Sequence, residues 1–379
     1  MSDDPIPFNY PFVAGKELYY MAEAVFSGQI ASNGAFTRRC QAELERRTGA
    51  EKVLLTHSCT AALELAALLC GVAPGHEVIM PSFTFVSTAN AFVLRGATPV
   101  FVDIRPDTLN LDESLLEAAI TPRTRAIVPV HYAGVACDMD AIMGIARAHG
   151  IPVIEDAAQG IEASYKGRAL GTIGDLGCWS FHETKNLICG EGGALAVNDP
   201  ALRERAQILW EKGTDRAAFE RGEVDRYTWQ DLGSSFAPSE LIAGFLAAQL
   251  EEAEQITARR AATHRRYLEG LHDLEQAGKL QLPRVPADCG NNAHLFPLLL
   301  PTQEQRDALL SFLRGRGIGA VFHYIPLHDS PFARRAGYYT GPLPVTEDVS
   351  RRLARLPCYY ELSPEQQQRV IDAVHAFFA

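Results

Sequence analysis

The sequence has no apolar run near the roughly 20 residues that a helix needs to cross a bilayer. Its eight cysteines are scattered, with no CxxC pair and no spacing typical of a metal site. The opening stretch, MSDDPIPFNYPF, contains neither a basic region nor an apolar core of the kind found in secretory leaders. We therefore expect a cytoplasmic protein with reduced thiols, no bound metal and no membrane contact.

Basic residues are also few. The 35 lysines and arginines are outnumbered by 46 aspartates and glutamates, which leaves a net charge of -11. A nucleic acid or an anionic membrane would need a basic face, so neither is an expected partner. No GxGxxG turn follows the first predicted strand, which disfavours a dinucleotide-binding protein. Any phosphorylated ligand must then be held by local hydrogen-bond donors.

Apolar segments alternate with helical ones through the first half of the chain. At 379 residues, with 47% hydrophobic and 21% charged residues, the chain is long enough for two domains. From Lys52 onward, amphipathic or turn-rich segments follow a series of apolar runs, which are KVLLT, EVIM, TPVFVD, RAIVPV and PVIEDA. This alternation predicts an α/β fold whose mostly parallel sheet is covered by helices on both faces.

The second half indicates a different unit. Residues 201–272 are helix-rich but are interrupted by a polar stretch at 213–238, which is typical of a functional, mobile or interface loop. After the PRVP linker at 283–286, a smaller α+β unit is predicted, with helices at 304–316, 346–354 and 364–378. We predict a large domain of residues 1–250, including the N-terminal arm, and a small domain of residues 251–379.

Lys185 has a distinctive sequence setting. The apolar run CWSF at 178–181 precedes it, and the turn GEGG at 190–193 follows it. We expect Lys185 on a short loop between two buried strands, where partial desolvation lowers the pKa of an amine and favours a nucleophile. An arbitrary lysine is more often an exposed turn residue, but only six lysines occur in the chain.

A carboxylate lies upstream of this lysine. Asp156 is near the end of the run PVIEDA, and ligands bind at the carboxyl ends of the strands in open parallel sheets. Pyridoxal phosphate needs a lysine to form a Schiff base and an acid to keep its pyridine nitrogen protonated. Lys185 and Asp156 together therefore predict this cofactor, although a strand-end aspartate alone is more often a helix cap.

The turn HSCTAA at 57–62 is a candidate phosphate site, because it follows the first predicted strand and opens a helix. The N–H groups and the dipole of a helix start suit a dianion. Ser180 is a further hydroxyl donor, and Phe83 and Phe85 are candidates to stack on a planar ring. Each has an ordinary alternative, which is capping for the turn, a satisfied strand hydroxyl for Ser180 and core packing for the phenylalanines.

Several ordered motifs together resemble a known family. SCTAAL, PSFTFVSTANAF, VFVDI, PVHYAG, IEDAAQ, GCWSFHETKN and GEGGA are similar to the DegT/DnrJ/StrS group of sugar-nucleotide aminotransferases, which are fold-type I pyridoxal-phosphate enzymes. The resemblance extends to FHYIPLH in the C-terminal unit and so covers essentially the whole chain. FTRRCQ, FVSTANAFVLRGA and FHETKN are most similar to transaminases that make dTDP-4-amino-4,6-dideoxygalactose.

The resemblance implies cofactor roles for residues at matching positions. Lys185 would be the Schiff-base lysine, Asp156 the partner of the pyridinium nitrogen, and Gln159 a contact to the cofactor face or its ring hydroxyl. The phosphate and ring contacts would come from Cys59, Thr60, Ser180 and Phe85. Many relatives place an asparagine that reaches the phosphate across a dimer interface where this chain has GSS at 233–235, so Ser235 would replace that amide.

The resemblance also implies the reaction and its partners. L-glutamate would donate an amino group to a nucleotide-linked 4-keto-6-deoxy sugar in a homodimer with a composite active site. Members that dehydrate sugars carry a histidine in place of the lysine, so Lys185 favours transamination. The alternatives are another nucleotide keto sugar, such as a 3-keto sugar or one giving the gluco epimer, and a non-catalytic regulator of the same fold.

Candidate substrate residues are polar groups near the matching motifs. Packing, strand-end or exposed-helix roles explain each of them equally well. The candidates for the sugar pocket are Glu183, His323, Tyr324 and His328, together with His131 and Tyr132; Arg38 and Arg39 are candidates for the diphosphate.

Overall fold

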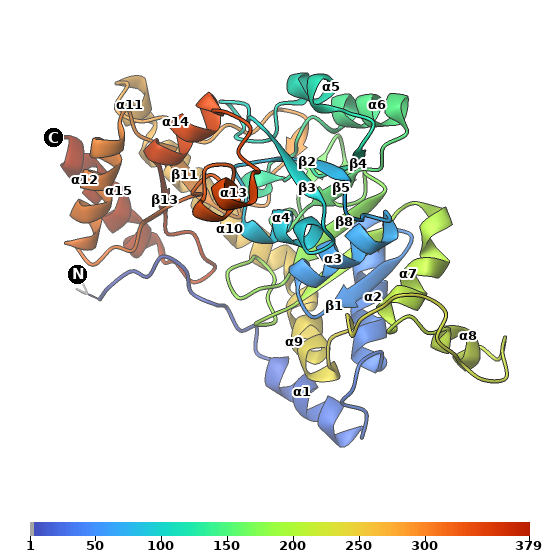
Figure 1. The fold of residues 1–379 in the computed structure, drawn as a ribbon. Helices are drawn as coiled ribbons and strands as arrows, with labels where there is room; N and C mark the ends of the chain where they lie inside the picture. The colour runs from blue at the N-terminus through green and yellow to red at the C-terminus, as the bar shows by residue number, and fades with distance from the viewer. Residues whose placement is uncertain (1–3) are drawn as a thin grey trace.

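The computed structural model describes residues 4–379, and a seven-stranded sheet lies at its centre (Figure 1). The strand order is β3-β2-β4-β5-β8-β9-β1, with parallel bridges between Ile127 and Val153 and between Val130 and Asp156 joining β4 to β5. Only β9 runs antiparallel to its neighbours, so the prediction of a mostly parallel sheet is confirmed. The strands are β1 Val53–Thr56, β2 Glu77–Pro81, β3 Thr98–Val102, β4 Thr124–Ile127, β5 Ile154–Asp156, β8 Leu176–Ser180 and β9 Gly193–Val197.

Helices cover both faces of this sheet, as the alternation of side chains along its strands requires. In β1, Val53 and Leu55 belong to one core cluster and Leu54 belongs to another. Two hydrophobic cores therefore lie on opposite sides of the sheet. The helices around them are α2 Ala35–Thr48, α3 Cys59–Leu69, α4 Val86–Val93, α5 Leu116–Ala119, α6 Met139–His149, α7 Arg203–Trp210 and α9 Glu240–Glu251 (Figure 1).

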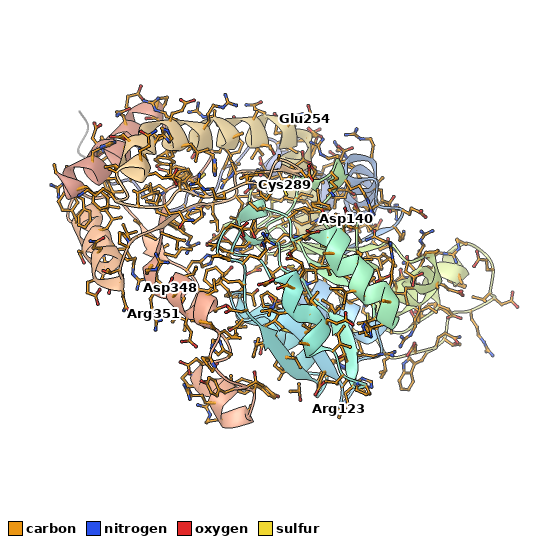
Figure 2. All side chains as sticks on the ribbon, turned by 90° about the horizontal axis from the view of Figure 1, so that it is seen from above. Arg123, Asp140, Glu254, Cys289, Asp348 and Arg351 are labelled. Atoms are coloured by element: carbon orange, nitrogen blue, oxygen red, sulfur yellow. The ribbon has the colours of Figure 1, made fainter. Side chains whose placement is uncertain are left out.

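The C-terminal part has a core of its own, formed mainly by residues between Tyr267 and Val374. Its sheet is antiparallel with the order β11-β13-β12. Helix α10 begins near Glu254 and runs toward the C-terminal helices (Figure 2). The elements of this part are α10 Ala253–Gly270, α11 His272–Gln276, β11 Phe296–Leu299, α12 Gln303–Arg314, β12 Val321–Phe322, α13 Pro331–Ala336, α14 Pro344–Arg352, β13 Leu353–Leu356 and α15 Pro364–Phe378.

The N-terminal arm departs from the sequence-based assignment to the large domain. Ile6 packs in the C-terminal core and exchanges backbone hydrogen bonds with Gly317 and Gly319, both at 2.8 Å. Helix α1, Glu17–Phe26, instead packs against α9. The arm therefore connects the two parts of the molecule, and the domain boundary at residue 250 stays a prediction.

Smaller elements complete the fold. Strands β6 Ser164–Tyr165, β7 Arg168–Ala169 and β10 Cys289–Gly290 form an antiparallel sheet in the order β10-β6-β7. The polar stretch at 213–238 contains the short helix α8, Arg216–Glu220, and projects from the body of the molecule (Figure 1). Within residues 4–379, the helices are all too short or too polar to cross a membrane.

Candidate active site

A cavity of about 480 Å³ lies at the carboxyl ends of the central strands, where open α/β sheets bind ligands. The large sheet supplies the floor and the start of α3 supplies one side. The C-terminal part closes the other side with residues from 294–295, 323–324 and 355–358. Chemically active groups in its wall are Ser58, Thr60, Asp156, Ser180, Lys185 and Arg355.

Lys185 enters this cavity from the connection between β8 and β9. Because β8 and β9 pair antiparallel, residues 181–192 form a turn-rich link, in which the N–H of Lys185 donates to the carbonyl of His182 at 2.9 Å. Burial lowers the pKa of the Lys185 amine, and nearby Arg355 acts in the same direction, while Cys59 and Asp156 oppose it. No hydrogen bond or ion pair joins Nζ to the part of the chain that is described. The amine is thus free to react with a ligand.

Asp156 faces the same cavity from the end of β5. Its carboxylate is 4% exposed and is fixed by two donors, the hydroxyl of Thr88 at 2.7 Å and the N–H of Ala158 at 3.1 Å. Thr88 is itself held by the hydroxyl of Thr84 at 2.7 Å. Among residues 4–379, Asp156 has no ion-pair partner, so its charge is directed at the cavity. A protonated ring nitrogen is the kind of group that this arrangement suits.

The first turn of α3 is a ready anion site. Ser58 caps the helix by accepting from the N–H of Ala61 at 3.0 Å, while the N–H groups of Cys59 and Thr60 find no acceptor within the described residues. Such unpaired donors at a helix N-terminus favour a phosphate. A β-carbon at Gly193 would collide with the backbone of Ser58 and Cys59, so β9 approaches this turn closely only because residue 193 is glycine.

Hydroxyl groups and an aromatic ring surround this turn. Thr60 donates its hydroxyl to Ser87 at 2.8 Å, and Ser180 reaches the cavity from the end of β8. Phe85 lies at the cavity wall with 58% of its surface exposed. Phe83 is buried instead, with edge-on contacts to Tyr132 and Tyr324. Phe85 is therefore available to stack on a ligand ring, whereas Phe83 packs in the core.

The donor set fits pyridoxal phosphate. A desolvated, unpaired lysine, an oriented carboxylate and a helix start with free N–H groups lie in the wall of one cavity. These are the groups that hold the aldehyde, the ring nitrogen and the phosphate of this cofactor.

Comparisons with known proteins agree with the geometry. A model of the DegT/DnrJ/EryC1/StrS aminotransferase family matches residues 13–375. The chain belongs to this family. The spore coat polysaccharide biosynthesis protein SpsC of Bacillus subtilis (strain 168) is 36% identical, over 97% of this chain and 96% of SpsC. The aminotransferase TlmJ from Streptoalloteichus hindustanus is 32% identical with a TM-score of 0.90, covering 99% of both chains.

A further structural relative bears on the cofactor. Spr1654 from Streptococcus pneumoniae, solved in a PLP form, is 27% identical with a TM-score of 0.89 and 98% of both chains covered. This protein is therefore a sugar aminotransferase that uses pyridoxal phosphate. The predicted family, fold type and cofactor are confirmed.

In this aminotransferase, Gln159 is held within the protein at both ends of its amide. Its oxygen accepts from the N–H of Ala133 at 2.6 Å, and its nitrogen donates to the hydroxyl of Tyr324 at 3.0 Å. Both Gln159 and Tyr324 line the cavity, and so does His323, whose Nδ1 lies 3.1 Å from the hydroxyl of Tyr132. Three of the predicted residues, Gln159, His323 and Tyr324, thus line the same cavity.

Other predicted residues lie elsewhere. Glu183 is exposed on the Lys185 connection and is not part of the cavity wall. His328 is fully buried and is not part of the cavity wall; its Nδ1 lies 2.7 Å from the hydroxyl of Ser82 and its Nε2 lies 3.3 Å from Glu347, which matches the packing alternative. Ser235 is exposed in the projecting stretch and does not face the cavity of its own chain.

The predicted diphosphate contacts also have local partners. Arg38 donates to the carbonyl of Asn33 at 2.7 Å. Arg39 pairs with Glu251 and stacks on Tyr20 at 4.9 Å from the ring centre. Neither arginine lines the cavity, so the alternative of an exposed helix face describes them better within this chain.

His131 and its partner Glu155 form a buried contact on the far side of β5 from the cavity. Nε2 of His131 lies 2.8 Å from the Glu155 carboxylate, which also accepts from the N–H groups of Gly171, Ile173 and Gly174 at 2.6 to 2.8 Å. Although burial opposes ionisation, these donors hold the pKa of Glu155 below its usual range. The pair fixes the end of β5, and His131 does not line the cavity, which matches the strand-end alternative for this residue.

Sequence reasoning missed several cavity residues from the C-terminal part, of which Arg355 and His294 carry side-chain nitrogen groups. Arg355 lies in β13, donates to the carbonyl of Phe322 at 3.0 Å, and has a buried Nε without a partner. Burial lowers the pKa of Arg355, and no carboxylate among the described residues pairs with it. The signal was an arginine inside the apolar run LARL. The second residue, His294, ends the sequence NNAH ahead of β11.

Proposed function

We propose that this enzyme transfers the amino group of L-glutamate to the 4-keto group of dTDP-4-dehydro-6-deoxy-D-glucose. The products are dTDP-4-amino-4,6-dideoxy-D-galactose and 2-oxoglutarate. The observation that carries the proposal is the desolvated, unpaired amine of Lys185 beside the oriented carboxylate of Asp156 in one cavity. The sugar and its stereochemistry rest on the sequence motifs FTRRCQ, FVSTANAFVLRGA and FHETKN.

The residues divide the chemistry between them. Bound pyridoxal phosphate supplies an electron sink next to the reacting carbon. Asp156, held by Thr88 and Ala158, would keep a proton on the ring nitrogen. Lys185 would tether the cofactor and, once released as a neutral amine, would take the proton from the α-carbon of the donor and later deliver one to the sugar carbon. One residue therefore serves both halves of a ping-pong reaction.

Arg355 is the group in the described cavity wall that best matches the carboxylate of the amino donor. Its guanidinium is partly buried and lacks an anionic partner in residues 4–379, which is costly unless a ligand supplies one. The α-carboxylate of an amino acid is one bond from the reacting carbon, whereas the diphosphate of a sugar nucleotide is separated from C4 by the sugar ring. An arginine close enough to lower the pKa of Lys185 therefore suits the amino acid.

A homodimer with a composite site is part of the proposal. Large apolar side chains are exposed on α1 and in the projecting stretch, with Phe26 at 88% and Trp229 at 80% exposure. Clustered apolar exposure of this kind is typical of an interface. In a dimer, the hydroxyl of the exposed Ser235 would reach the phosphate bound at the α3 turn of the partner chain. Within the described residues of one chain, the N–H groups of Cys59 and Thr60 in this turn have no acceptor.

The test is product analysis with the purified enzyme. Incubation with L-glutamate and dTDP-4-dehydro-6-deoxy-D-glucose should give an amine that is axial at C4, which proton couplings in an NMR spectrum identify. An equatorial amine would indicate the gluco epimer instead. Turnover only with a 3-keto sugar nucleotide would show that the proposed 4-keto substrate is wrong. The absence of turnover with every keto sugar would favour the non-catalytic alternative.

A further inference from the structure

The segment of residues 291–294, NNAH, is held in a strained conformation at the cavity. Ala293 has a φ of 53°, a left-handed value that alanine rarely adopts. Its N–H donates to the side chain of Asn291 at 2.6 Å, and Asn291 donates to the carbonyl of Ala133 at 3.0 Å. Asn292 donates to the carbonyls of Gln159 and Ile161 at 2.8 and 2.7 Å. Strain that is held by this many contacts is typical of functional sites.

A buried arginine secures the other side of this segment. Arg260 of α10 is 3% exposed and donates to the carbonyls of Ala293 at 3.2 Å and His294 at 2.7 Å. The backbone of His294 is therefore fixed by its own carbonyl and by its N–H, which donates to Asn292 at 3.1 Å. These hydrogen bonds fix the backbone so that the imidazole of His294 forms part of the cavity wall.

The hydrogen atoms of the His294 ring are also fixed. The amide N–H of Asn186 donates to the carbonyl of Asn292 at 2.8 Å, so the amide oxygen of Asn186 is the atom at 2.9 Å from Nδ1 of His294. A carbonyl oxygen only accepts, so Nδ1 carries the proton and Nε2 is a hydrogen-bond acceptor. Burial, followed by Lys185, Arg260 and Arg355, holds the pKa of His294 well below its ordinary value, which keeps the ring neutral.

The acceptor on Nε2 has no partner among residues 4–379, although His294 is only 5% exposed. A histidine that serves packing alone usually has both nitrogens satisfied. Lys185 and Arg355 lie in the same cavity wall, but neither donates a hydrogen bond to Nε2 of His294. A ligand hydroxyl would supply the missing donor. The amino donor brings two carboxylates, which the lone pair of Nε2 would repel, whereas a sugar brings several hydroxyl groups.

We propose that His294 is a specificity-determining residue, whose Nε2 accepts a hydrogen bond from a ring hydroxyl of the sugar substrate. The inference rests on the proposed sugar-nucleotide function. It assigns sugar binding to a residue that was not among the candidates from the sequence. The sugar half of the reaction then depends on His294, and the glutamate half does not.

The test compares His294→Phe, which removes the acceptor but keeps a ring, with His294→Gln, whose amide oxygen restores an acceptor. Binding of dTDP-6-deoxy-D-galactose, which has a hydroxyl in place of the product amine and does not react, is measured by calorimetry on the holoenzyme. We expect the dissociation constant to rise about tenfold in His294→Phe, as for loss of one hydrogen bond, and to recover in His294→Gln. Single-turnover conversion with L-glutamate should be unchanged in both.

Two controls separate this role from a structural one. His264→Phe changes a second buried, neutral histidine of the C-terminal part, which lies outside the cavity wall, and should leave both half-reactions intact. If His294→Phe does not fold, 2-deoxy and 3-deoxy derivatives of the same nucleotide are titrated into the wild-type holoenzyme. One of them should bind about tenfold more weakly if its missing hydroxyl is the partner.

The outcomes are distinct. Unchanged sugar binding in His294→Phe, equal binding of all deoxy derivatives, or a slower glutamate half-reaction would overturn the inference while the proposed function stands. A wild-type enzyme that aminates no keto sugar would overturn the proposed function, and the assignment of His294 with it.

Discussion

At the scale of single residues, the side chain of Lys185 is under opposing electrostatic influences. Burial and Arg355 disfavour its charged form, and Cys59 and Asp156 favour that form. The net effect is a pKa below the ordinary value of 10.5, so more of the neutral amine is present at a given pH than for an exposed lysine.

Replacing Lys185 with alanine should abolish transamination, because both the tether and the proton-transferring amine are lost. The measurement is steady-state formation of 2-oxoglutarate. Lys166→Ala is the matched control, since Lys166 is exposed and pairs with Asp140 at 2.7 Å, and it should retain full activity. Substantial turnover by the Lys185 variant would remove this residue from the mechanism.

The same lysine predicts a pH dependence of stability in the apoenzyme. A lysine whose folded pKa is lowered binds fewer protons in the folded state than in the unfolded state between the two pKa values, so stability rises with pH in that window. Lys185→Met removes the half-buried amine and should raise the melting temperature at pH 7. This advantage should shrink as the pH approaches 10.5, the unfolded value. An advantage that is independent of pH would point to packing instead.

Asp156→Asn separates charge from shape. The amide oxygen can keep the hydrogen bond from the N–H of Ala158, and the amide nitrogen can donate to Thr88, whose hydroxyl can still donate to Thr84. The fold should therefore survive while the ring nitrogen loses its charged partner. Rapid-scan spectroscopy with L-glutamate should show that the first half-reaction is slower by orders of magnitude. A wild-type rate would show that Asp156 has only a structural role at the end of its strand.

At the scale of elements, the sequence pattern located most helices because their periodicity and caps are local signals. The helices predicted at 304–316, 346–354 and 364–378 correspond to α12, α14 and α15. The antiparallel direction of β9 has no such signal, since strand direction depends on the path of the connecting loop. Lys185 and Asp156 were predicted because Lys185 follows one apolar run of the large sheet and Asp156 ends another, whereas His294 and Arg355 were missed because only tertiary packing brings the C-terminal part to the cavity.

The contact between β9 and the start of α3 gives a prediction at this scale. A β-carbon at Gly193 would meet the backbone of Ser58 and Cys59, so Gly193→Ala should displace the first turn of α3 and weaken cofactor binding. Fluorescence titration of the apoenzyme with pyridoxal phosphate measures this. Gly144→Ala in α6 is the control, because its added carbon meets no neighbour within 4 Å and should leave the affinity unchanged.

At the scale of the whole molecule, the N-terminal arm and the cavity both connect the two parts of the chain. Ile6 is fastened to Gly317 and Gly319, and the cavity takes its carboxylate and lysine from the sheet but His294 and Arg355 from the C-terminal part. A change in how the two parts pack should therefore alter the proposed substrate contacts of His294 and Arg355 more than the proposed cofactor contacts of Lys185 and Asp156.

The composite site is the prediction that belongs to this scale. Helix α1 packs against α9 on one side and exposes Leu18, Tyr19 and Phe26 on the other, which is an apolar surface that a second copy of the chain would cover. Phe26→Glu should convert a dimer into a monomer in sedimentation velocity and should lower activity together with cofactor affinity. Leu115→Glu changes an exposed residue directly before α5, a helix at the opposite end of the molecule from α1 (Figure 1), and should do neither.

Ser235 distinguishes a composite site from simple association. If its hydroxyl reaches the phosphate of the other subunit, Ser235→Ala should leave the dimer intact and weaken pyridoxal phosphate binding about tenfold, which corresponds to the loss of one hydrogen bond to a charged group. Mixing Ser235→Ala subunits with Lys185→Ala subunits should then yield hybrid dimers in which the one site with Lys185 has an intact Ser235 opposite it. Those hybrids should bind the cofactor at that site with wild-type affinity, whereas a contact within one chain would leave the affinity of that site weakened.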